Sequence, residues 1–215
     1  MEPPGPEPAE PPAFAASPAA EPEAPVEPEA PAEAFELPFM TSMSGEASSK
    51  AAWEFTEKYL GERFGDIRVL AVHVHGPGVI HKKGEPVRTT ADFEGLKLRG
   101  PSRQANKLLE KLGATPVGMP VPAVPEALSK GVIDATVIPW EVTGALKVPE
   151  LVKNHTEFGD DALYTTAFIF AMNKEKYESL PDDLKAAIDS QSGAEFSRMA
   201  GAQMQADDAP GREQA

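Results

Sequence analysis

The sequence predicts an α/β fold preceded by an extended acidic tail. Between residues 68 and 172, short β-rich apolar runs alternate with segments of helical periodicity, a pattern typical of strands joined by helices. Residues 1–36 consist largely of Pro, Glu and Ala and offer few large apolar side chains for a core. We therefore expect one folded α/β region behind a tail that does not fold.

The tail is defined by its prolines and glutamates. Twelve of the 23 prolines lie between Pro3 and Pro38, and no Lys or Arg precedes Lys50. Such a stretch cannot bury enough apolar surface to offset the entropy of ordering, and its like charges repel. We expect residues 1–36 to be disordered. They show neither the basic start nor the apolar run of a secretory signal, so the chain as written is expected to stay in the cytoplasm.

Charge and composition exclude several classes of function. The formal net charge of −14 argues against nucleic acid or an anionic membrane as partner, since both require a basic surface. The chain has no cysteine, which excludes disulfides, zinc–thiolate sites and cysteine nucleophiles. It also lacks a phosphate-binding glycine loop, a dinucleotide fingerprint, a serine-hydrolase elbow and an HExxH motif. We therefore predict neither an enzyme nor a cofactor.

The secondary-structure elements follow in order along the chain. The clearest helix is expected where Ala105, Leu109 and Leu112 share one face and Gly113 follows. Helices are expected at residues 48–60, 102–112, 125–130, 141–151 and 181–204. Strands or extended segments are expected at residues 68–74, 96–99, 115–119, 132–138 and 163–172, the last with Phe168 and Phe170 in the core. Ligands of such sheets bind beyond the carboxyl ends of the strands.

Residues 92–140 carry a family resemblance. They read DFEGLKLRGPSRQANKLLEKLGATPVGMPVPAVPEALSKGVIDATVIPW. This stretch resembles the DctP-type solute-binding proteins of TRAP (tripartite ATP-independent periplasmic) transporters: a strand ending in Arg, a helix, a Gly-Ala-Thr-Pro turn, then E-A-L-x-x-G-x-I-D. ELPFMT, LAVHVHGPG and AMNKEKYESLPDDLKAAI are also similar to the family and occur in its order. The resemblance implies a periplasmic-binding-protein-like fold with two lobes around a cleft.

The chain is shorter than the proteins it resembles. The resemblance implies an incomplete solute-binding region over residues 37–211, mainly the second lobe and part of the first. Residues 212–215 are expected to form a disordered end. With one wall of the cleft absent, we expect Arg99 to remain exposed to solvent. Binding is then millimolar at best, because an exposed ion pair contributes only ~0–1 kcal/mol.

Arg99 is the leading candidate for a binding residue. It ends the expected strand at residues 96–99, and a guanidinium offers a planar fork of donors that matches a carboxylate. The resemblance implies that Arg99 clamps the carboxylate of the ligand. The alternative is a surface arginine at a strand end. For Arg103, on the following helix, we favour a salt bridge over a site role.

His73 and His75 are two residues apart on an expected strand and therefore share a face. Such a pair is typical of metal ligands, but no nearby carboxylate precedes Glu85 to complete a set, so we do not predict a metal. The resemblance places this segment in the cleft and implies that His75 donates a hydrogen bond to the ligand. A core or surface histidine is the alternative.

Three further residues are expected to line the cleft. Trp140 directly follows the expected strand at residues 132–138, where an indole supplies an apolar wall and an N–H donor. An ordinary packed tryptophan is the alternative. The resemblance also implies that Phe39 and Thr166 lie on cleft-lining segments. The predicted ligand-binding set is Arg99, His75, Trp140, Phe39 and Thr166.

The resemblance implies a receptor function. The protein is expected to capture a small organic carboxylate in the periplasm and to deliver it to TRAP membrane subunits, without covalent chemistry and without itself spanning the membrane. The alternative is a truncated remnant or fusion protein, in which the acidic tail acts as a spacer and no transport occurs.

Overall fold

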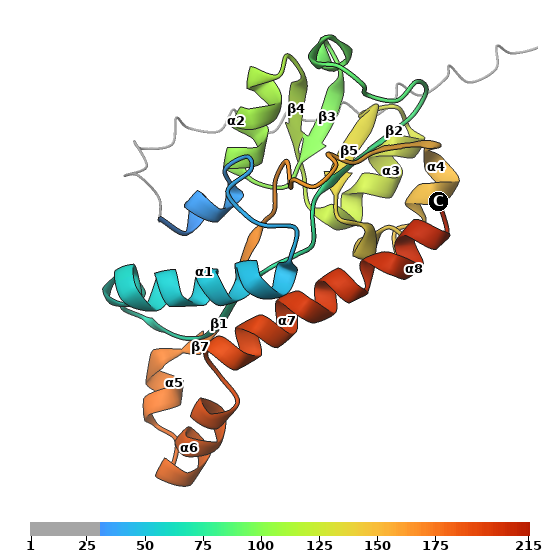
Figure 1. The fold of residues 1–215 in the computed structure, drawn as a ribbon. Coiled ribbons are helices and arrows are strands. Elements are labelled where there is room, and N and C mark those ends of the chain that lie inside the picture. Colours follow the sequence, from blue (N-terminus) through green and yellow to red (C-terminus); the bar gives the residue numbers. More distant parts are fainter. Residues whose placement is uncertain (1–30) are drawn as a thin grey trace, which may run out of the picture.

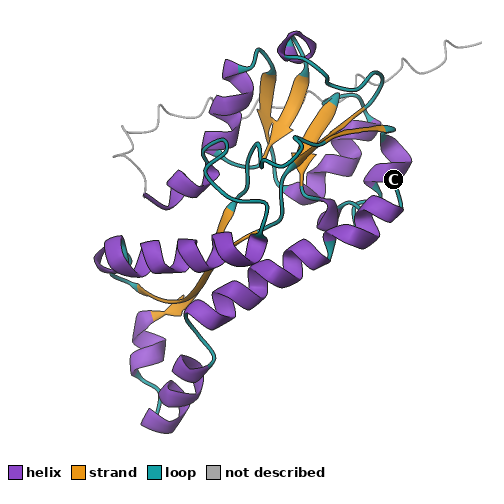
Figure 2. Cartoon of the chain, in the orientation of Figure 1, coloured by secondary structure: helices purple, strands orange, loops and turns teal. Residues whose placement is uncertain are grey.

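The computed structural model describes residues 31–215, which form two units joined side by side (Figure 1). One unit contains a five-stranded sheet and the other a two-stranded sheet with long helices beside it. Figure 2 shows helices packed around the strands in both units, in agreement with the predicted α/β class. Residues 1–30, the larger part of the expected tail, lie outside the described residues.

The five-stranded sheet has the strand order β4-β3-β5-β2-β6. Its strands are β2 Val79–Lys82, β3 Lys97–Gly100, β4 Thr115–Gly118, β5 Ala135–Ile138 and β6 Asn154–Thr156. β3 runs parallel to both β4 and β5, whereas β2 is antiparallel to β5 and β6. The carboxyl ends of β3, β4 and β5 therefore meet at one edge of the sheet, where α/β sheets bind ligands. The sequence predicted these three strands but missed β2 and β6.

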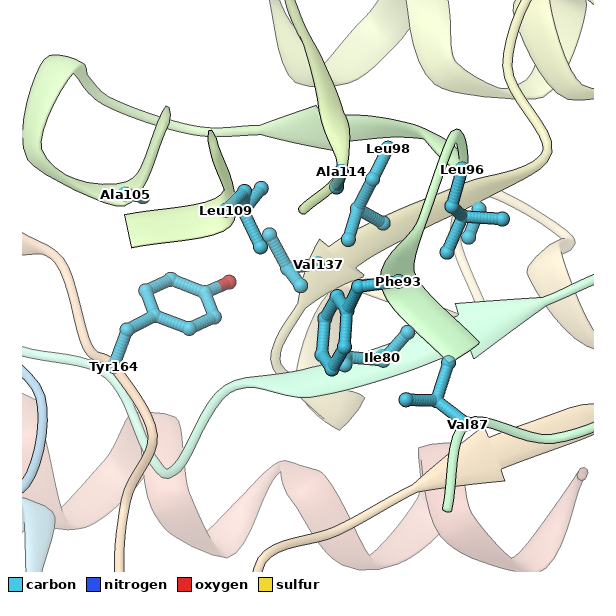
Figure 3. Packing of buried hydrophobic residues seen from close by; sticks show 11 residues of the cluster. Ile80, Val87, Phe93, Leu96, Leu98, Ala105, Leu109, Ala114, Val137 and Tyr164 are labelled. Carbon is cyan, nitrogen blue, oxygen red and sulfur yellow. The ribbon is translucent and has the colours of Figure 1, made fainter. Parts of the chain in front are cut away.

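This sheet has an apolar core on each face. The covering helices are α2 Arg103–Lys111, α3 Val124–Ser129 and α4 Val148–Leu151. On the α2 face, Leu98, Leu109 and Val137 belong to one buried cluster (Figure 3). On the other face, Leu128 and Ile138 belong to a second cluster, with residues of α3 and α4. Side chains alternate along a strand, so Val137 and Ile138 serve different faces.

The second unit is built on β1 and β7. β1 Ile67–Val74 pairs antiparallel with β7 Ala167–Asn173. Helices α1 Gly45–Tyr59 and α7 Ala194–Ala206 lie beside each other and against β1 (Figure 1). A side chain on Gly201 would overlap the α1 backbone, so glycine permits this close approach of the two helices.

The expectation that Phe168 and Phe170 are core residues is wrong. Phe168 is 39% exposed and Phe170 is 53% exposed, and Ile169 between them is also exposed. A sheet of two strands offers little surface to cover aromatic side chains. The buried cluster of this unit is correspondingly small: Ala52, Val72 and Val74.

Two expected helices are divided into shorter pieces. The expected helix at residues 181–204 consists of α6 Asp182–Ser190 and α7, separated at Gly193, whose φ is 89°. This left-handed conformation cannot continue an α-helix and favours glycine. The expected helix at residues 141–151 becomes a 3-10 turn, η5 Trp140–Val142, and the single turn α4. The short helix α5 Lys174–Glu178 was not predicted.

The predicted boundaries of both disordered ends require correction. Pro31–Glu36 forms a 3-10 helix, η1, which packs against α1, α2 and β7. Helix α8 Asp208–Glu213 includes part of the expected C-terminal tail, and its Arg212 forms an ion pair with Glu157. Both segments are held by side chains distant in sequence, and local composition cannot reveal such contacts.

Over residues 31–215, no helix has both the length and the apolar character needed to cross a bilayer.

Candidate functional site

Arg99 lies near the carboxyl end of β3 and is only 3% exposed. Its Nε donates a hydrogen bond to the carbonyl oxygen of Met119 at 3.0 Å, and its Nη1 donates to that of Val137 at 3.3 Å. Met119 follows β4 and Val137 belongs to β5, so the guanidinium bonds to both neighbours of its own strand. The expectation of a solvent-exposed Arg99 is therefore wrong.

The charge of Arg99 has no counter-ion among the residues that the structure describes. Within residues 31–215, no Asp or Glu lies within ion-pair distance of this guanidinium, and its two hydrogen bonds go to neutral carbonyls. Burial lowers the pKa of Arg99, yet an arginine remains protonated in proteins. A buried cation normally requires an anionic partner. The site is therefore suited to an anion that comes from outside the chain.

A pocket of about 690 Å³ is lined by Arg99 together with the first turns of α2 and the residues that follow β4. The buried Oδ1 of Asn106 has no hydrogen-bond partner there. Arg103 and Lys107 add two cations to the lining, against one acid, Glu110. The sequence did not single out Asn106. Its one local signal is that it lies one helical turn after Ser102, which caps the helix.

Two internal carboxylates bind the first turn of α2. Glu36 accepts a hydrogen bond from Ser102 Oγ at 2.6 Å and from the backbone N–H of Ala167 at 3.3 Å. Burial raises the pKa of Glu36, and the Ser102 hydrogen bond partly opposes this shift. Glu33 accepts from Arg103 Nη2 at 2.6 Å, which confirms the expected salt-bridge role of Arg103. Glu36 thus connects the two units directly beside the pocket.

His75 and Thr166, both predicted site residues, lie in contact with each other. The backbone N–H of Thr166 donates to His75 Nε2 at 3.1 Å, so Nδ1 carries the ring proton and donates to the carbonyl oxygen of Gly76. Burial lowers the pKa of His75 to about 4, and the ring is neutral at pH 7. Both ring nitrogens are thus engaged within the protein. The hydroxyl of Thr166 is buried and has no hydrogen-bond partner within residues 31–215.

Trp140 and Phe39 lie apart from the Arg99 pocket. Trp140 is buried, its ring centroid lies 4.8 Å from that of His81, and its Nε1–H donates to Glu157 at 2.7 Å. Phe39 is 59% exposed and lines a separate pocket of about 310 Å³ with Phe93 and other apolar side chains. The structure therefore distributes the five predicted residues over separate places rather than around one cavity.

His73 and His75 are not joined by further metal ligands. In the part of the chain that the structure describes, no three His, Asp or Glu side chains are grouped as a metal site would require. The ring of His73 stacks on Phe168, with centroids 5.2 Å apart. The Nδ1 atom of His73 is buried and has no hydrogen-bond partner among the described residues.

Comparison with known proteins identifies relatives of this architecture. Residues 16–208 match the family model "bacterial extracellular solute-binding protein, family 7". A TRAP solute-binding protein from Rhodoferax ferrireducens, solved with copurified benzoate, is 51% identical with a TM-score of 0.82; the match covers 85% of this chain and 57% of that one.

Two further solved structures are similar. A TRAP solute-binding protein of an unidentified marine microbe, in complex with 3-hydroxybenzoate, is 50% identical (TM-score 0.81; 84% of this chain, 57% of that chain). One from Bordetella bronchiseptica, with bound mandelate, is 30% identical (TM-score 0.78; 85% and 58%). The match spans 48% of one curated relative and 34% of another. The three solved relatives are TRAP solute-binding proteins. The chain belongs to the bacterial extracellular solute-binding protein family 7.

Proposed function

We propose that this chain forms the ligand-binding part of a TRAP transporter receptor and that Arg99 binds the carboxylate of an aromatic organic acid. The observation that carries the proposal is a buried guanidinium that no acid of residues 31–215 pairs with. A carboxylate has the charge and the two oxygen acceptors that this group requires, and a dry environment strengthens the contact. Benzoate, 3-hydroxybenzoate and mandelate in the relatives support the choice of an aromatic acid.

Capture of such an acid requires no covalent step. Binding places the carboxylate on Arg99, and the remainder of the solute takes up space in the adjoining pocket of about 690 Å³. Delivery to TRAP membrane subunits in the periplasm is part of the proposal, supported by the family membership. Although the chain as a whole is acidic, Arg99 and Lys107 bring positive charge to the lining of this pocket, which favours an anion there.

Replacement of Arg99 tests this function. Arg99→Lys keeps the positive charge but loses the planar fork, so the affinity for benzoate should fall by the equivalent of ~2–5 kcal/mol. Titrating the ¹⁵N-labelled 215-residue chain with benzoate, to saturation or to the limit of solubility, measures the dissociation constant even when binding is weak.

The matched control for this experiment is Arg198→Lys. Arg198 forms exposed ion pairs with Glu46 and Glu195, far from the pocket, so its replacement should leave benzoate binding unchanged. Far-UV circular dichroism shows whether each variant is folded. A folded Arg99→Lys protein with the dissociation constant of the unmodified chain contradicts the proposed function.

A further inference from the structure

Tyr164 carries a buried hydroxyl without a hydrogen-bond partner. The side chain is 2% exposed, and its Oη contacts no donor or acceptor among the described residues. Leaving a buried hydroxyl unsatisfied costs roughly 1–3 kcal/mol. Native proteins seldom retain such a group, and where they do it calls for an explanation such as a partner that binds later.

The backbone fixes the position of the Tyr164 ring. The N–H of Gly78 donates to the carbonyl oxygen of Tyr164 at 3.0 Å, and a side chain at position 78 would overlap the ring itself. The ring of His75 packs edge-on against it, with centroids 5.5 Å apart. The phenol is therefore held in one orientation, without freedom to turn toward solvent.

The hydroxyl is directed toward the surroundings of Arg99. In Figure 3 it points toward Leu109 and Val137, and the carbonyl oxygen of Val137 is the one that accepts from Arg99 Nη1. The positive charge of Arg99 also acts on the phenol: burial raises the pKa of Tyr164, and Arg99 partly opposes that shift. The group therefore remains a neutral O–H donor at physiological pH.

Two groups in this part of the five-stranded unit thus lack the partner that their chemistry calls for. Among the described residues the Arg99 guanidinium bonds only to neutral carbonyls and has no counter-ion, and the Tyr164 hydroxyl has no acceptor. A carboxylate offers two adjacent oxygens and satisfies both at once. We propose that Tyr164 is a second ligand-binding residue and that its O–H donates to the carboxylate held by Arg99, an inference that rests on the proposed function. Tyr164 then acts in ligand selection, because only a ligand with an acceptor at this point compensates its buried hydroxyl.

The proposal makes stability and binding change in opposite directions. Tyr164→Phe removes the unsatisfied oxygen and keeps the packing of the ring, so the ligand-free protein should melt at the same or a higher temperature. Its affinity for benzoate should fall about 10- to 100-fold, the effect of one hydrogen bond to a charged group. A purely structural role for Tyr164 does not combine these two changes.

Tyr177→Phe is the matched control. The hydroxyl of Tyr177 already donates to Asp189 at 2.7 Å, on α6 in the other unit. Its loss should lower the melting temperature and leave benzoate affinity unchanged, the reverse of Tyr164→Phe. Both variants and Arg99→Lys are titrated with benzoate by ¹⁵N NMR on the full 215-residue chain, and their melting is followed by circular dichroism.

The outcomes separate this inference from the function on which it rests. Weaker binding by both Arg99→Lys and Tyr164→Phe, with Tyr177→Phe unaffected, supports it. Loss of binding in Arg99→Lys together with unchanged binding in Tyr164→Phe overturns the role of Tyr164 and leaves the proposed function intact. Unchanged binding in a folded Arg99→Lys protein, or no benzoate binding by the unmodified chain, overturns both.

Discussion

The five-stranded sheet and the two-stranded sheet bury their side chains to very different extents. In the first, every residue of β5 is buried, and apolar clusters fill both faces. In the second, β7 leaves Phe168, Ile169 and Phe170 exposed. The unit with the complete core is also the one that holds Arg99 away from solvent. Burial of a cation that no acid of the described residues pairs with is costly, and here it occurs in the unit that has an apolar cluster on each face of its sheet.

The largest difference between the units should appear in core deletions. Leu128 lies on α3 and is fully buried, so Leu128→Ala should lower the free energy of unfolding by about 2–5 kcal/mol. Phe170 is half-exposed in β7, and Phe170→Ala should cost less than about 1 kcal/mol. Urea unfolding monitored by circular dichroism measures both values. Equal losses of unfolding free energy would contradict the expected difference between the units, because they would show that Phe170 on β7 contributes as much as Leu128 in the larger core.

An intermediate effect is expected where the two units join. Asp208 at the start of α8 accepts a hydrogen bond from the backbone N–H of Glu141 in η5 at 2.9 Å. Burial raises the pKa of Asp208 to about 6 and, with the charge of Asp208, raises that of Glu141 to about 7. The charged groups Glu157 and Arg212 also face Asp208.

The sign of the pH effect follows from these shifts. The folded state holds a proton on Asp208 more tightly than the unfolded state, so its stabilising contribution is complete below about pH 4 and is lost as the pH rises through about 6. Asp208→Asn keeps an acceptor oxygen but cannot ionise, so the variant avoids the destabilisation that a buried Asp208 carboxylate causes at high pH. The variant should be more stable than the unmodified chain at pH 8 by roughly 1–2 kcal/mol, with a smaller gain at pH 4. Thermal melts at both pH values test this. If the variant and the unmodified chain differ in stability by the same amount at pH 4 and pH 8, Asp208 does not titrate between these pH values.

The smallest effect is expected from the N-terminal residues. The Pro-Glu-Ala sequence of residues 1–30 predicts no contribution to either core, so a chain that begins at Pro31 should keep the melting temperature of the full chain. The shortened chain must retain Glu33 and Glu36, because both accept hydrogen bonds from residues at the start of α2. Removal through Glu36 serves as the comparison and should lower the melting temperature. A loss of stability on removing residues 1–30 alone would contradict the predicted tail.

Local patterns in the sequence were sufficient for the elements of the five-stranded unit that have a clear period. The apolar face of α2 and the runs that form β3 and β5 were predicted correctly, because helix and strand periodicity depend on near neighbours. The division of the helix was missed, since a glycine is compatible with a helix, whereas Gly193 takes a φ of 89° at the N-cap of α7, after α6 has ended at Ser190. The 3-10 helix at Pro31–Glu36 was not predicted, because the residues that hydrogen-bond to it lie some 70 positions away in the sequence.

For the candidate site, the sequence by itself predicted Arg99, since the resemblance of its segment to the family implies that this strand-terminal arginine binds a carboxylate. It could not determine which other side chains accompany that arginine. Trp140 was predicted for the cleft, yet its indole donates to Glu157, and Tyr164 lay unnoticed in an expected strand. Whether a polar atom is satisfied depends on contacts between residues far apart in the chain, and such contacts exist only once the tertiary structure has formed.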